Sequence, residues 1–501
     1  MTPQTEVELK FRIPDAARKA LVAEMARAPA TRTLLQAMYL DTADRRLAKQ
    51  DMAWRLRREG RRWIQTLKGG GSGALERFEH EVVRPDASHD ASGHAGTLLG
   101  DALIALLRRA QEDGVEAEVR FRTQIRRTAR RIRTRGAVVE VAFDEGRLLA
   151  GESALLVREF EFELVSGSVA AMLALAQRWR KRFGLVYEPR SKAERGDRLA
   201  DGLPHAALRK AQQASYGGPA IASDAFGAVV DECLAHITRN ATGLTDGEPA
   251  ARVEHVHQLR VGIRRLRSAL RSFDGWVPAA PDELVAGLRA LFATLGQSRD
   301  SDVLDSGVVA ALAKVRGAPP LPLPAGAAGP DPAALVTADD AQRTFLDWIA
   351  WRADFSHVAH SAGGTDIEPA DAKTFRRDAE RRLRRWHARI AAEGNVFDEL
   401  DDTRLHALRK RIKRQRYAVE FFLPVLRPRK TARYLKALAA VQERMGELND
   451  LMVARDRYQA LLASDPAAWF ALGWLAARIA EVRTFAKAEL GQLAQAEPPR
   501  A

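Results

Sequence analysis

The sequence predicts an α+β multidomain protein: an N-terminal closed antiparallel β-barrel with flanking helices, then an all-α helical bundle with an internal pseudo-twofold repeat. Three observations predict this class. From residue 1 to about 198, apolar residues recur with a period of 2, which is typical of strands. After about residue 223 the period becomes 3.6, which is typical of helices. Within the helical part, one segment recurs 149 residues later, which indicates a duplication.

The strands of the N-terminal part each carry one charged face. The stretch EVELKFRI, residues 6–13, alternates charged and apolar residues without a break, and MAWRLRR, VRFRTQIRR and REFEFEL repeat this alternation. The charged positions are Glu6, Glu8, Lys10, Arg55, Arg57, Arg120, Arg122, Glu159, Glu161 and Glu163. Because successive side chains of a strand point to opposite faces, each stretch predicts a strand with one charged and one apolar face.

Charges of one sign along one strand repel each other unless an opposite charge lies between the strands. A hard cation such as Mg²⁺ would satisfy the carboxylates, and a chain of phosphates would satisfy Arg and Lys. The ordinary alternative is a solvated outer face with cross-strand salt bridges. Because several strands share this pattern, we predict that the sheet closes into a tunnel with its charged face inside, which also removes the edge strands.

The chain changes composition at two places. The stretch DGLPHAALRKAQQASYGGPAIASD separates the strand-rich part from the helical part. The Pro/Gly/Ala tract over residues 316–334 divides the helical part, because proline interrupts helices. We therefore expect a barrel domain over residues 1–200, a linker over 201–222 and a helical domain over 223–495, with halves at about 223–315 and 336–495.

The helical part contains two motifs, each of them twice. HQLRVGIRRLRSALRSF, from His257, matches HALRKRIKRQRYAVEFF, from His406. LGQSRDSDV, from Leu295, matches MGELNDLMV, from Met445, at nearly the same spacing. Two motifs in one order at nearly one spacing predict pseudo-twofold symmetry.

Each copy of the first motif places a histidine and several cations along one stripe of a helix, beside an apolar stripe. The first stripe contains His257, Arg260, Arg264 and Arg267, and the second contains His406, Arg409, Lys413 and Arg416. A charge run is usually a solvated face, but cations three and four residues apart repel one another. Because both copies keep the stripe, we predict that it binds a polyanion.

The overall charge agrees with polyanion binding. Lys and Arg number 79 against 65 Asp and Glu, a net charge of +14, although an Arg-rich genomic composition would give the same excess. The single cysteine, Cys233, cannot form an internal disulfide, and we find no targeting segment and no apolar stretch of about 20 residues. We expect a cytoplasmic protein without a membrane partner. Nucleic acid is disfavoured because the stripes lack interleaved aromatic residues.

The front half resembles the CYTH domain of the triphosphate tunnel metalloenzymes. EVELK is similar to the ExExK signature of that family, and YLDT, RLRRE, TLKG, ERFEHE, RFRT, FDEG, EFEFEL and SKAERG follow in the family's order. The resemblance covers roughly residues 3 to 200. It implies a β-tunnel in which metal and cationic side chains hold a triphosphate.

The resemblance also implies roles for single positions. The implied metal-site carboxylates are Glu6, Glu8, Glu159, Glu161 and Glu163. The implied substrate-binding cations are Arg55, Arg57, Lys68, Arg120, Arg122 and Lys192. Lys10 completes the signature, and the expected catalytic set is Glu6, Glu8, Lys10 and Glu161. Tyr39, Asp41 and Asp144 are candidates for a supporting role. The implied cofactor is Mg²⁺, with Mn²⁺ as an alternative.

The back half resembles the CHAD domain, the conserved-histidine α-helical domain, over about residues 223 to 495. The duplicated histidine helices and the RDSDV and LNDLM segments are similar to its two motifs. The resemblance implies a helical domain that binds inorganic polyphosphate in a basic groove, and whether the two repeats are equivalent stays open. The second copy departs at Asn449 and Met452, where the first has Arg299 and Asp302.

These observations lead to one main hypothesis. We expect metal-dependent hydrolysis of inorganic triphosphate to pyrophosphate and phosphate, with polyphosphate bound by the helical domain and polyphosphate granules as a candidate location. Thiamine triphosphate, nucleoside triphosphates and ATP cyclisation stay open as alternatives, as does a non-catalytic polyphosphate-binding protein. The acidic set disfavours the last alternative, because binding alone would need only the cations. The oligomeric state stays open.

Overall fold

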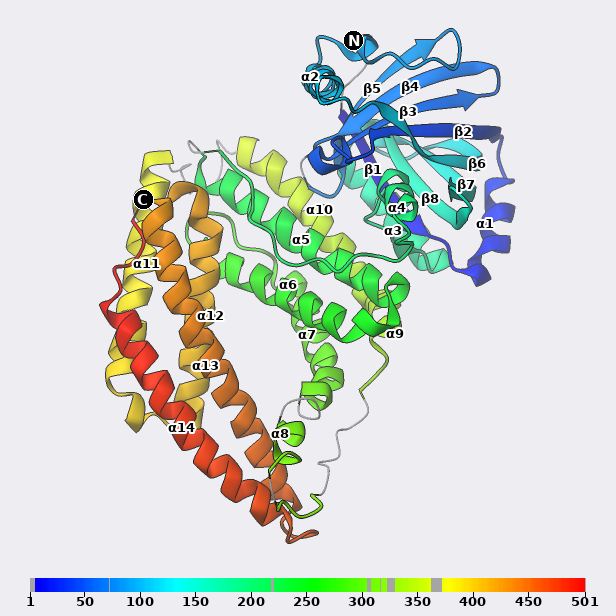
Figure 1. The fold of residues 1–501 in the computed structure, drawn as a ribbon. Helices are drawn as coiled ribbons and strands as arrows, with labels where there is room; N and C mark the ends of the chain where they lie inside the picture. Colours follow the sequence, from blue (N-terminus) through cyan, green and yellow to red (C-terminus); the bar gives the residue numbers. More distant parts are fainter. Residues whose placement is uncertain are drawn as a thin grey trace. The chain divides into compact units, whose positions relative to one another are not determined.

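The computed structural model describes residues 5–71, 73–217, 220–303, 308–315, 317–321, 329–361 and 372–500. The chain forms two compact units, which are described separately here (Figure 1). The barrel unit contains Met1–Arg209, Leu234–His255 and Val336–Val358. The helical unit contains Lys210–Cys233, Val256–Leu335 and Ala359–Ala501. These boundaries differ from the expected domains, because two helical segments cluster with the barrel.

In the described residues of the barrel unit, eight strands close into an antiparallel barrel and a short ninth strand lies beside the first. The strands are β1 (Thr5–Arg12), β2 (Thr31–Thr42), β3 (Met52–Glu59), β4 (Arg62–Gly69), β5 (Glu76–Arg84), β6 (Ala117–Arg133), β7 (Ala137–Ala150), β8 (Ser153–Gly167) and β9 (Val186–Tyr187). Their order is β5-β4-β3-β2-β6-β7-β8-β1-β9, and pairing between β5 and β1 closes the ring. The predicted closed antiparallel barrel is confirmed.

The period-2 pattern of β1 and β8 places apolar side chains on the outside of the barrel. Phe11 of β1 and Phe160 and Phe162 of β8 are fully buried. They form a ring cluster with Trp179 of α3 (Val169–Phe183), in which Phe160 stacks on Trp179 at 5.1 Å and Phe11 meets Phe162 edge-on at 5.7 Å. The apolar face therefore lies under a helix, which leaves the charged face for the interior.

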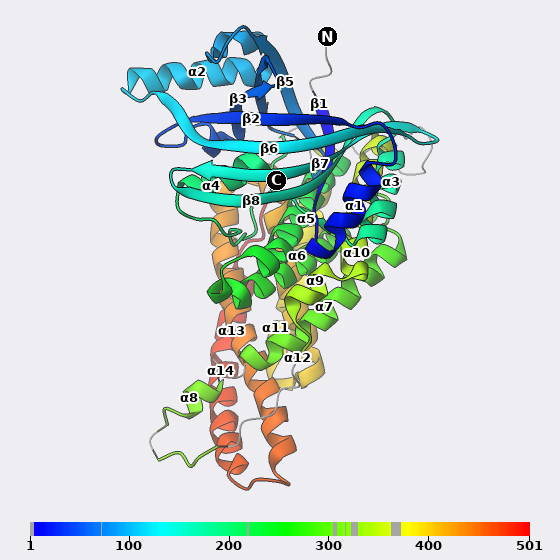
Figure 2. The same cartoon turned by 90° about the vertical axis from the view of Figure 1, so that its right-hand side faces the viewer.

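Helix α2 (Leu98–Glu112) covers the outer side of another part of the barrel (Figure 2). It begins where Thr97 accepts a hydrogen bond from the backbone N–H of Gly100, which caps the first turn. Leu103 of this helix packs into one core cluster with Trp54 of β3 and Leu67 of β4. All three side chains are almost fully buried, so the cluster fixes β3 and β4 with their charged residues inward.

One stretch of the barrel interior is apolar and is closed by α4 (Lys192–Ala200). The rings of Tyr39 and Phe121 stack at 4.4 Å, and Leu199 of α4 joins the same core cluster. A Cβ atom at Gly196 would lie 2.1 Å from the Phe121 ring, so only glycine allows α4 to approach this closely. Helix α4 is thereby held with its first residue, Lys192, at the charged part of the interior.

The other helices are α1 (Arg18–Met25), α5 (Ala222–Asp246), α6 (Arg252–Ser272), α7 (Asp282–Val303), α8 (Ala310–Leu312), α9 (Pro332–Thr337), α10 (Asp339–Ser361), α11 (Ala372–Asn395), α12 (Asp402–Phe422), α13 (Pro428–Leu461) and α14 (Ala468–Gln495). The described residues between Leu312 and Pro332 form no helix, in agreement with the proline-rich tract. Helices α13 and α14 lie side by side as a long antiparallel pair (Figure 2). In the part of the chain that the structure describes, no helix is long and apolar enough to cross a membrane.

The two copies of the repeat meet at equivalent positions of the helical unit. Phe273, the residue after α6, and Phe422 of α12 hold the same place in their repeats, and their ring centroids lie 5.2 Å apart. Phe226 of α5 and Phe375 of α11 are also separated by the repeat offset, and they pack against Phe273 at 5.3 and 6.1 Å. The duplication therefore extends to the helices that precede the histidine helices, and the core forms where both copies meet.

Candidate functional site

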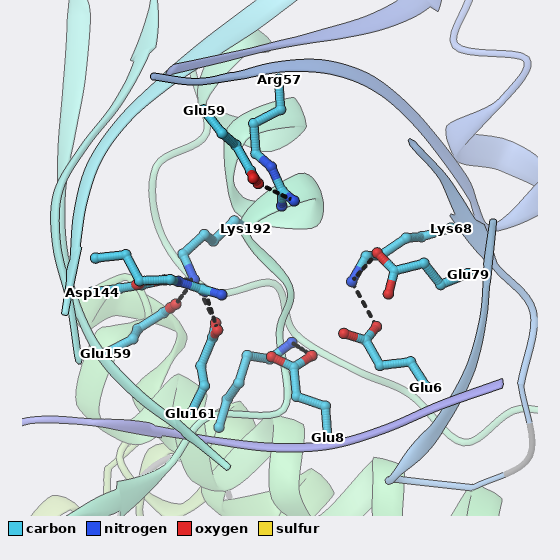
Figure 3. A network of polar contacts seen from close by, with 12 residues as sticks. Glu6, Glu8, Arg57, Glu59, Lys68, Glu79, Asp144, Glu159, Glu161 and Lys192 are labelled. Carbon is cyan, nitrogen blue, oxygen red and sulfur yellow. Dashed lines mark hydrogen bonds and ion pairs between the residues drawn. The ribbon is translucent and has the colours of Figure 1, made fainter. Parts of the chain in front are cut away.

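A cavity of about 1020 Å³ occupies the interior of the barrel. Its wall contains carboxylates and cations together, and they come from most of the strands and from α4. Figure 3 shows the labelled side chains pointing from the surrounding strands toward the centre of the ring. The closed sheet therefore has its charged face inside, as the alternation predicted.

Three buried carboxylates converge on one side of the cavity: Asp144 of β7 and Glu159 and Glu161 of β8. We call them the acidic triad. One oxygen of each lies within 4.8 Å of the corresponding oxygens of the other two. The register of β7 and β8 brings them together, because Asp144 lies opposite Glu159, and Ala142 lies opposite Glu161.

Lys192 places its ammonium group among the three carboxylates of the acidic triad. Its Nζ atom lies 2.9 Å from Asp144 Oδ2, 2.6 Å from Glu159 Oε2 and 2.5 Å from Glu161 Oε1. Figure 3 shows the Lys192 nitrogen with dashed lines to Glu159 and Glu161. The ammonium thus holds together three groups that would otherwise repel one another.

Two arginines complete the neutralisation of the acidic triad. Arg127 of β6 donates two 2.7 Å hydrogen bonds to Asp144, and its Nη2 also donates to Glu161. Arg195 of α4 donates to Glu159. Together with Lys192, three cations therefore face three carboxylates.

The protonation states follow from these contacts. Burial alone would raise the pKa of Asp144 and of Glu161, but the neighbouring cations outweigh burial and hold both pKa values below their usual range. Burial would also lower the pKa of Lys192, but the acidic triad raises it above its usual value. At neutral pH Asp144 and Glu161 are therefore charged carboxylates, and Lys192 is an ammonium.

The charged face of β1 forms a second group in the cavity. Lys68 Nζ of β4 donates to Glu6 at 2.6 Å and lies 3.0 Å from Glu79 of β5. Lys10 Nζ lies 3.5 Å from Glu8 on the same strand. Figure 3 shows Glu6, Lys68 and Glu79 across the cavity from the acidic triad.

The five carboxylates implied as metal ligands fall into two groups. Glu159 and Glu161 belong to the acidic triad, where Asp144 joins them. Glu163 of β8 lies opposite Glu8 in the β1–β8 register, on the side of Glu6 and Glu8. Burial and the like charge of Glu6 raise the pKa of Glu163 to about 7.

Arg55 and Arg57 of β3 reach the cavity as expected from their alternation. Arg57 lies 2.5 Å from Glu59 and 3.3 Å from Glu81. Arg55 Nη2 lies 3.7 Å from Glu79. Each guanidinium therefore has carboxylate neighbours in the interior.

Strand β6 departs from the strict alternation that predicted Arg120 and Arg122 on one inward face. The register between β2 and β6 shifts at Tyr39/Leu40, next to Arg120 and Phe121. Arg120 lines the cavity, where it donates to Asp201 at 2.6 Å. Contrary to expectation, Arg122 is exposed and lies outside the cavity lining. Arg127 lines the cavity instead. An alternation counted from Phe121, after the register shift, reaches Arg127 in the IRR segment and would have identified it.

Helix α4 is anchored at several points around the cavity. Ser191 caps it by accepting a hydrogen bond from the backbone N–H of Glu194. Glu194 is in turn bound by both terminal nitrogens of Arg239 on α5. Sequence reasoning missed Arg239, because it lies in the helical part of the chain, yet it lines the same cavity and belongs to the barrel unit.

The acidic triad fits a divalent metal ion. Carboxylate oxygens are the ligands that Mg²⁺ and Mn²⁺ prefer. Glu159 Oε2 is buried and accepts no hydrogen bond. It lies at ion-pair distance from the Lys192 ammonium, so its contact with Lys192 is electrostatic and not a hydrogen bond. Asp41, by contrast, has a structural role, because its carboxylate accepts hydrogen bonds from the backbone N–H groups of Thr42, Leu47 and Ala48.

The first cationic stripe of the helical unit gathers around one aromatic ring. The guanidinium carbons of Arg260, Arg264 and Arg267 lie 4.4, 6.0 and 5.8 Å from the centre of Phe292 on α7. Burial and the neighbouring cations lower the pKa of Arg267. His257 lies half-buried on the same helix. The side chains of residues 297–303, including Arg299 and Asp302 of the second motif, lie outside the described residues.

The second stripe connects the two motifs of its own copy. His406 is exposed, and its Nδ1 lies 3.2 Å from Asn449 Oδ1 on α13. Burial and the nearby Lys410 lower the pKa of His406. Arg409, Lys413 and Arg416 are half-buried, and Arg416 donates to Glu420 at 3.0 Å.

Comparisons with known proteins match both parts of the chain. Residues 4–196 match the CYTH domain, and residues 228–459 match the CHAD domain. An inorganic triphosphatase of Haemophilus influenzae is 30% identical over 161 residues, which are 32% of this chain and 44% of that protein. The chain thus covers less than half the length of that relative.

Two solved structures show further similarity. The CHAD domain from the plant Ricinus communis has 32% sequence identity, covers 59% of this chain and 99% of its own, and gives a TM-score of 0.46. A putative adenylate cyclase from Bacillus halodurans has 18% identity, covers 38% of this chain and 96% of its own, and gives a TM-score of 0.27. From the two family matches, the chain consists of a CYTH domain followed by a CHAD domain.

Proposed function

We propose that the barrel unit hydrolyses inorganic triphosphate to pyrophosphate and phosphate with the help of a divalent cation, Mg²⁺ first among the candidates. One observation carries this proposal: a cavity inside the barrel whose wall contains converging carboxylates together with Arg and Lys side chains. A linear polyphosphate with bound metal needs both kinds of group at once. The CYTH match and the name of the 30% identical relative support the same substrate.

The chain's own residues would divide the work by charge. Arg55, Arg57 and Lys68 would donate to phosphate oxygens and hold the triphosphate extended. Two groups of carboxylates, the acidic triad on one side and Glu6, Glu8 and Glu163 on the other, would each offer a place for a divalent cation. When bound, a divalent cation neutralises phosphate charge and lowers the pKa of a bound water. The closed barrel would exclude bulk water, which strengthens each of these contacts.

The first experiment is a phosphate-release assay on inorganic triphosphate, ATP and thiamine triphosphate. Purified protein is assayed with Mg²⁺, with Mn²⁺ and after EDTA treatment. We expect turnover of inorganic triphosphate to exceed that of the other two and to disappear with EDTA. Equal turnover of the three substrates, or turnover that survives EDTA, would contradict the proposal.

We further propose that the helical unit binds inorganic polyphosphate through the two stripes. The gathering of Arg260, Arg264 and Arg267 around Phe292 supports this, because it brings three like charges close to one aromatic ring. A polyphosphate competition assay against duplex DNA of equal phosphate concentration tests the proposal. Preference for polyphosphate is expected, and equal binding of both polyanions would contradict it.

A further inference from the structure

Lys192 occupies the point at which the three carboxylates of the acidic triad converge. All three Nζ–O distances lie between 2.5 and 2.9 Å. A metal ion bound by the same three oxygens would lie within about 2.0–2.6 Å of each of them. The ammonium and a metal ion would therefore compete for one position.

Charge strengthens this exclusion. The cluster is already balanced, because Lys192, Arg127 and Arg195 face three carboxylates. A divalent cation added to this balanced cluster would leave an excess of positive charge in a buried place, which is unfavourable. Departure of one cation would relieve half of that excess.

Lys192 and Arg127 differ in how firmly the acidic triad holds them. Arg127 is held to Asp144 by two parallel hydrogen bonds, a geometry that resists displacement. Lys192 contacts Glu159 without hydrogen-bond geometry, and its ammonium is carried on a flexible four-carbon chain. It also lines the cavity, so the side chain can turn toward the space that a triphosphate would fill.

We propose that Lys192 is an internal counter-ion that holds the acidic triad while the metal is absent and moves to a substrate phosphate when a divalent cation enters. The inference deepens the proposed function and rests on it, because it needs a metal in the acidic triad. Metal and triphosphate then bind with positive coupling, since the metal frees a phosphate ligand, and the coupling is reciprocal. It also means that Lys192 weakens metal binding when no substrate is present.

The test is a Mn²⁺ titration of the full chain without any phosphate compound, with free Mn²⁺ followed by electron paramagnetic resonance. The variant Lys192→Met keeps the length of the side chain and removes its charge. We expect it to bind Mn²⁺ about tenfold more tightly than the wild type, because a competing charge at contact distance is gone. The matched control is Arg57→Met, which removes a cavity charge that pairs with Glu59 and Glu81 and not with the acidic triad.

The control variant should stay within about threefold of the wild type, since only long-range repulsion changes. If Lys192→Met bound Mn²⁺ no more tightly than Arg57→Met, or if no form bound Mn²⁺, the inference would be overturned. Because the titration contains no substrate, it is independent of hydrolysis. Tight Mn²⁺ binding by Lys192→Met in a protein whose wild type hydrolyses nothing would refute the proposed function and support this inference.

A second measurement uses the wild type alone and so does not depend on the folding of a variant. Trace acetylation of lysines is quantified by mass spectrometry with and without saturating Mn²⁺, relative to the exposed Lys49. We expect labelling of Lys192 to rise several-fold with Mn²⁺, because the amine leaves its carboxylate partners for the open cavity. Unchanged or reduced labelling would mean that Lys192 stays in the acidic triad, and the inference would fail.

Discussion

At the scale of single residues, the two repeats differ where Arg271 of the first copy corresponds to Glu420 of the second. Glu420 binds Arg265, whose guanidinium is buried over the ring of Phe421 at 5.1 Å. The symmetry-related pair is Arg414 and Arg271. Burial and the positive charge of Arg271 lower the pKa of Arg414. One change of charge sign therefore turns one of two equivalent repulsive pairs into an attractive pair.

The variant Glu420→Gln should destabilise the helical unit by about 2 kcal/mol, because Arg265 would keep its charge in a buried site. Urea unfolding followed by circular dichroism measures the loss. The control is Glu481→Gln. Glu481 pairs with Arg478 near the surface of α14, so little change in stability is expected. Equal effects of both changes would show that the Arg265 pair has no special weight.

A second residue-scale prediction concerns acid sensitivity of the barrel unit. Burial and the neighbouring His80, whose Nδ1 lies 2.9 Å away, lower the pKa of the fully buried His94 to about 4. Between pH 6.5 and 4 the unfolded chain binds a proton at His94 that the folded chain does not, so this contribution to stability is lost as the pH falls. From pH 7 to 5 the loss should be about 1–2 kcal/mol.

The variant His94→Gln isolates this contribution. It cannot be protonated, but it can still hydrogen-bond to His80. Thermal unfolding at pH 7 and pH 5 should show a smaller drop in midpoint for the variant than for the wild type. The exposed His205, changed to Gln, should leave the wild-type drop intact. If the drop were the same in His94→Gln, burial of neutral His94 would not be its cause.

At the scale of elements, α4 joins the cavity to a helix that the sequence assigns to the other half of the chain. Its first residue is Lys192, its Arg195 binds Glu159, and its Glu194 is bound by Arg239 of α5. Arg12 of β1 also donates to Thr245 of α5 at 2.6 Å. The C-terminal part of α5 is therefore part of the scaffold that positions the site.

A charge swap tests this role of α5. Arg239→Glu and Glu194→Arg alone should each loosen α4 and raise the KM for triphosphate about tenfold, because the helix that carries Lys192 is no longer held at the cavity. The double variant restores an opposite-charge pair and should recover most of the loss. Amide hydrogen exchange within α4 gives a readout that does not depend on activity. Additive losses in the double variant would contradict a direct pair.

Much of this architecture could be predicted because strands and helices display their buried faces periodically. The faces of β1, β3 and β8 followed the alternation, so Glu6, Arg55 and Glu161 point inward as expected. Strand β6 could not be predicted in the same way, since one register shift reverses every side chain beyond it. The role of Arg239 also escaped prediction, because it depends on tertiary contact between segments distant in sequence.

At the scale of the whole molecule, positive charge serves two purposes that the sequence total of +14 does not distinguish. In the barrel cavity, Lys192 and Arg127 are balanced by carboxylates, and we propose that this site takes a metal and a short polyanion together. In the helical unit, Arg260 and Arg264 gather on an aromatic ring, and we propose that this stripe takes a polyanion without a metal. The two ligands should therefore be separable by mutation.

Glu161→Gln should abolish triphosphate hydrolysis and leave polyphosphate binding unchanged, because it alters only the acidic triad. Conversely, the triple change Arg260→Ala, Arg264→Ala and Arg409→Ala should weaken polyphosphate binding and preserve hydrolysis. The slope of log affinity against log salt concentration should also become less negative by about 2 to 3, since up to three phosphate contacts are lost.

The matched control for the triple variant removes the same charge elsewhere in the helical unit, at the exposed Arg381, Arg384 and Arg385 of α11. A similar loss of polyphosphate in the control would mean that binding follows net charge and not the stripes. Loss of hydrolysis in the Arg260, Arg264 and Arg409 variant would be more informative still. Since none of these side chains lines the barrel cavity, that result would mean that the occupancy of the helical unit controls the site in the barrel, and the two functions could not be treated as independent.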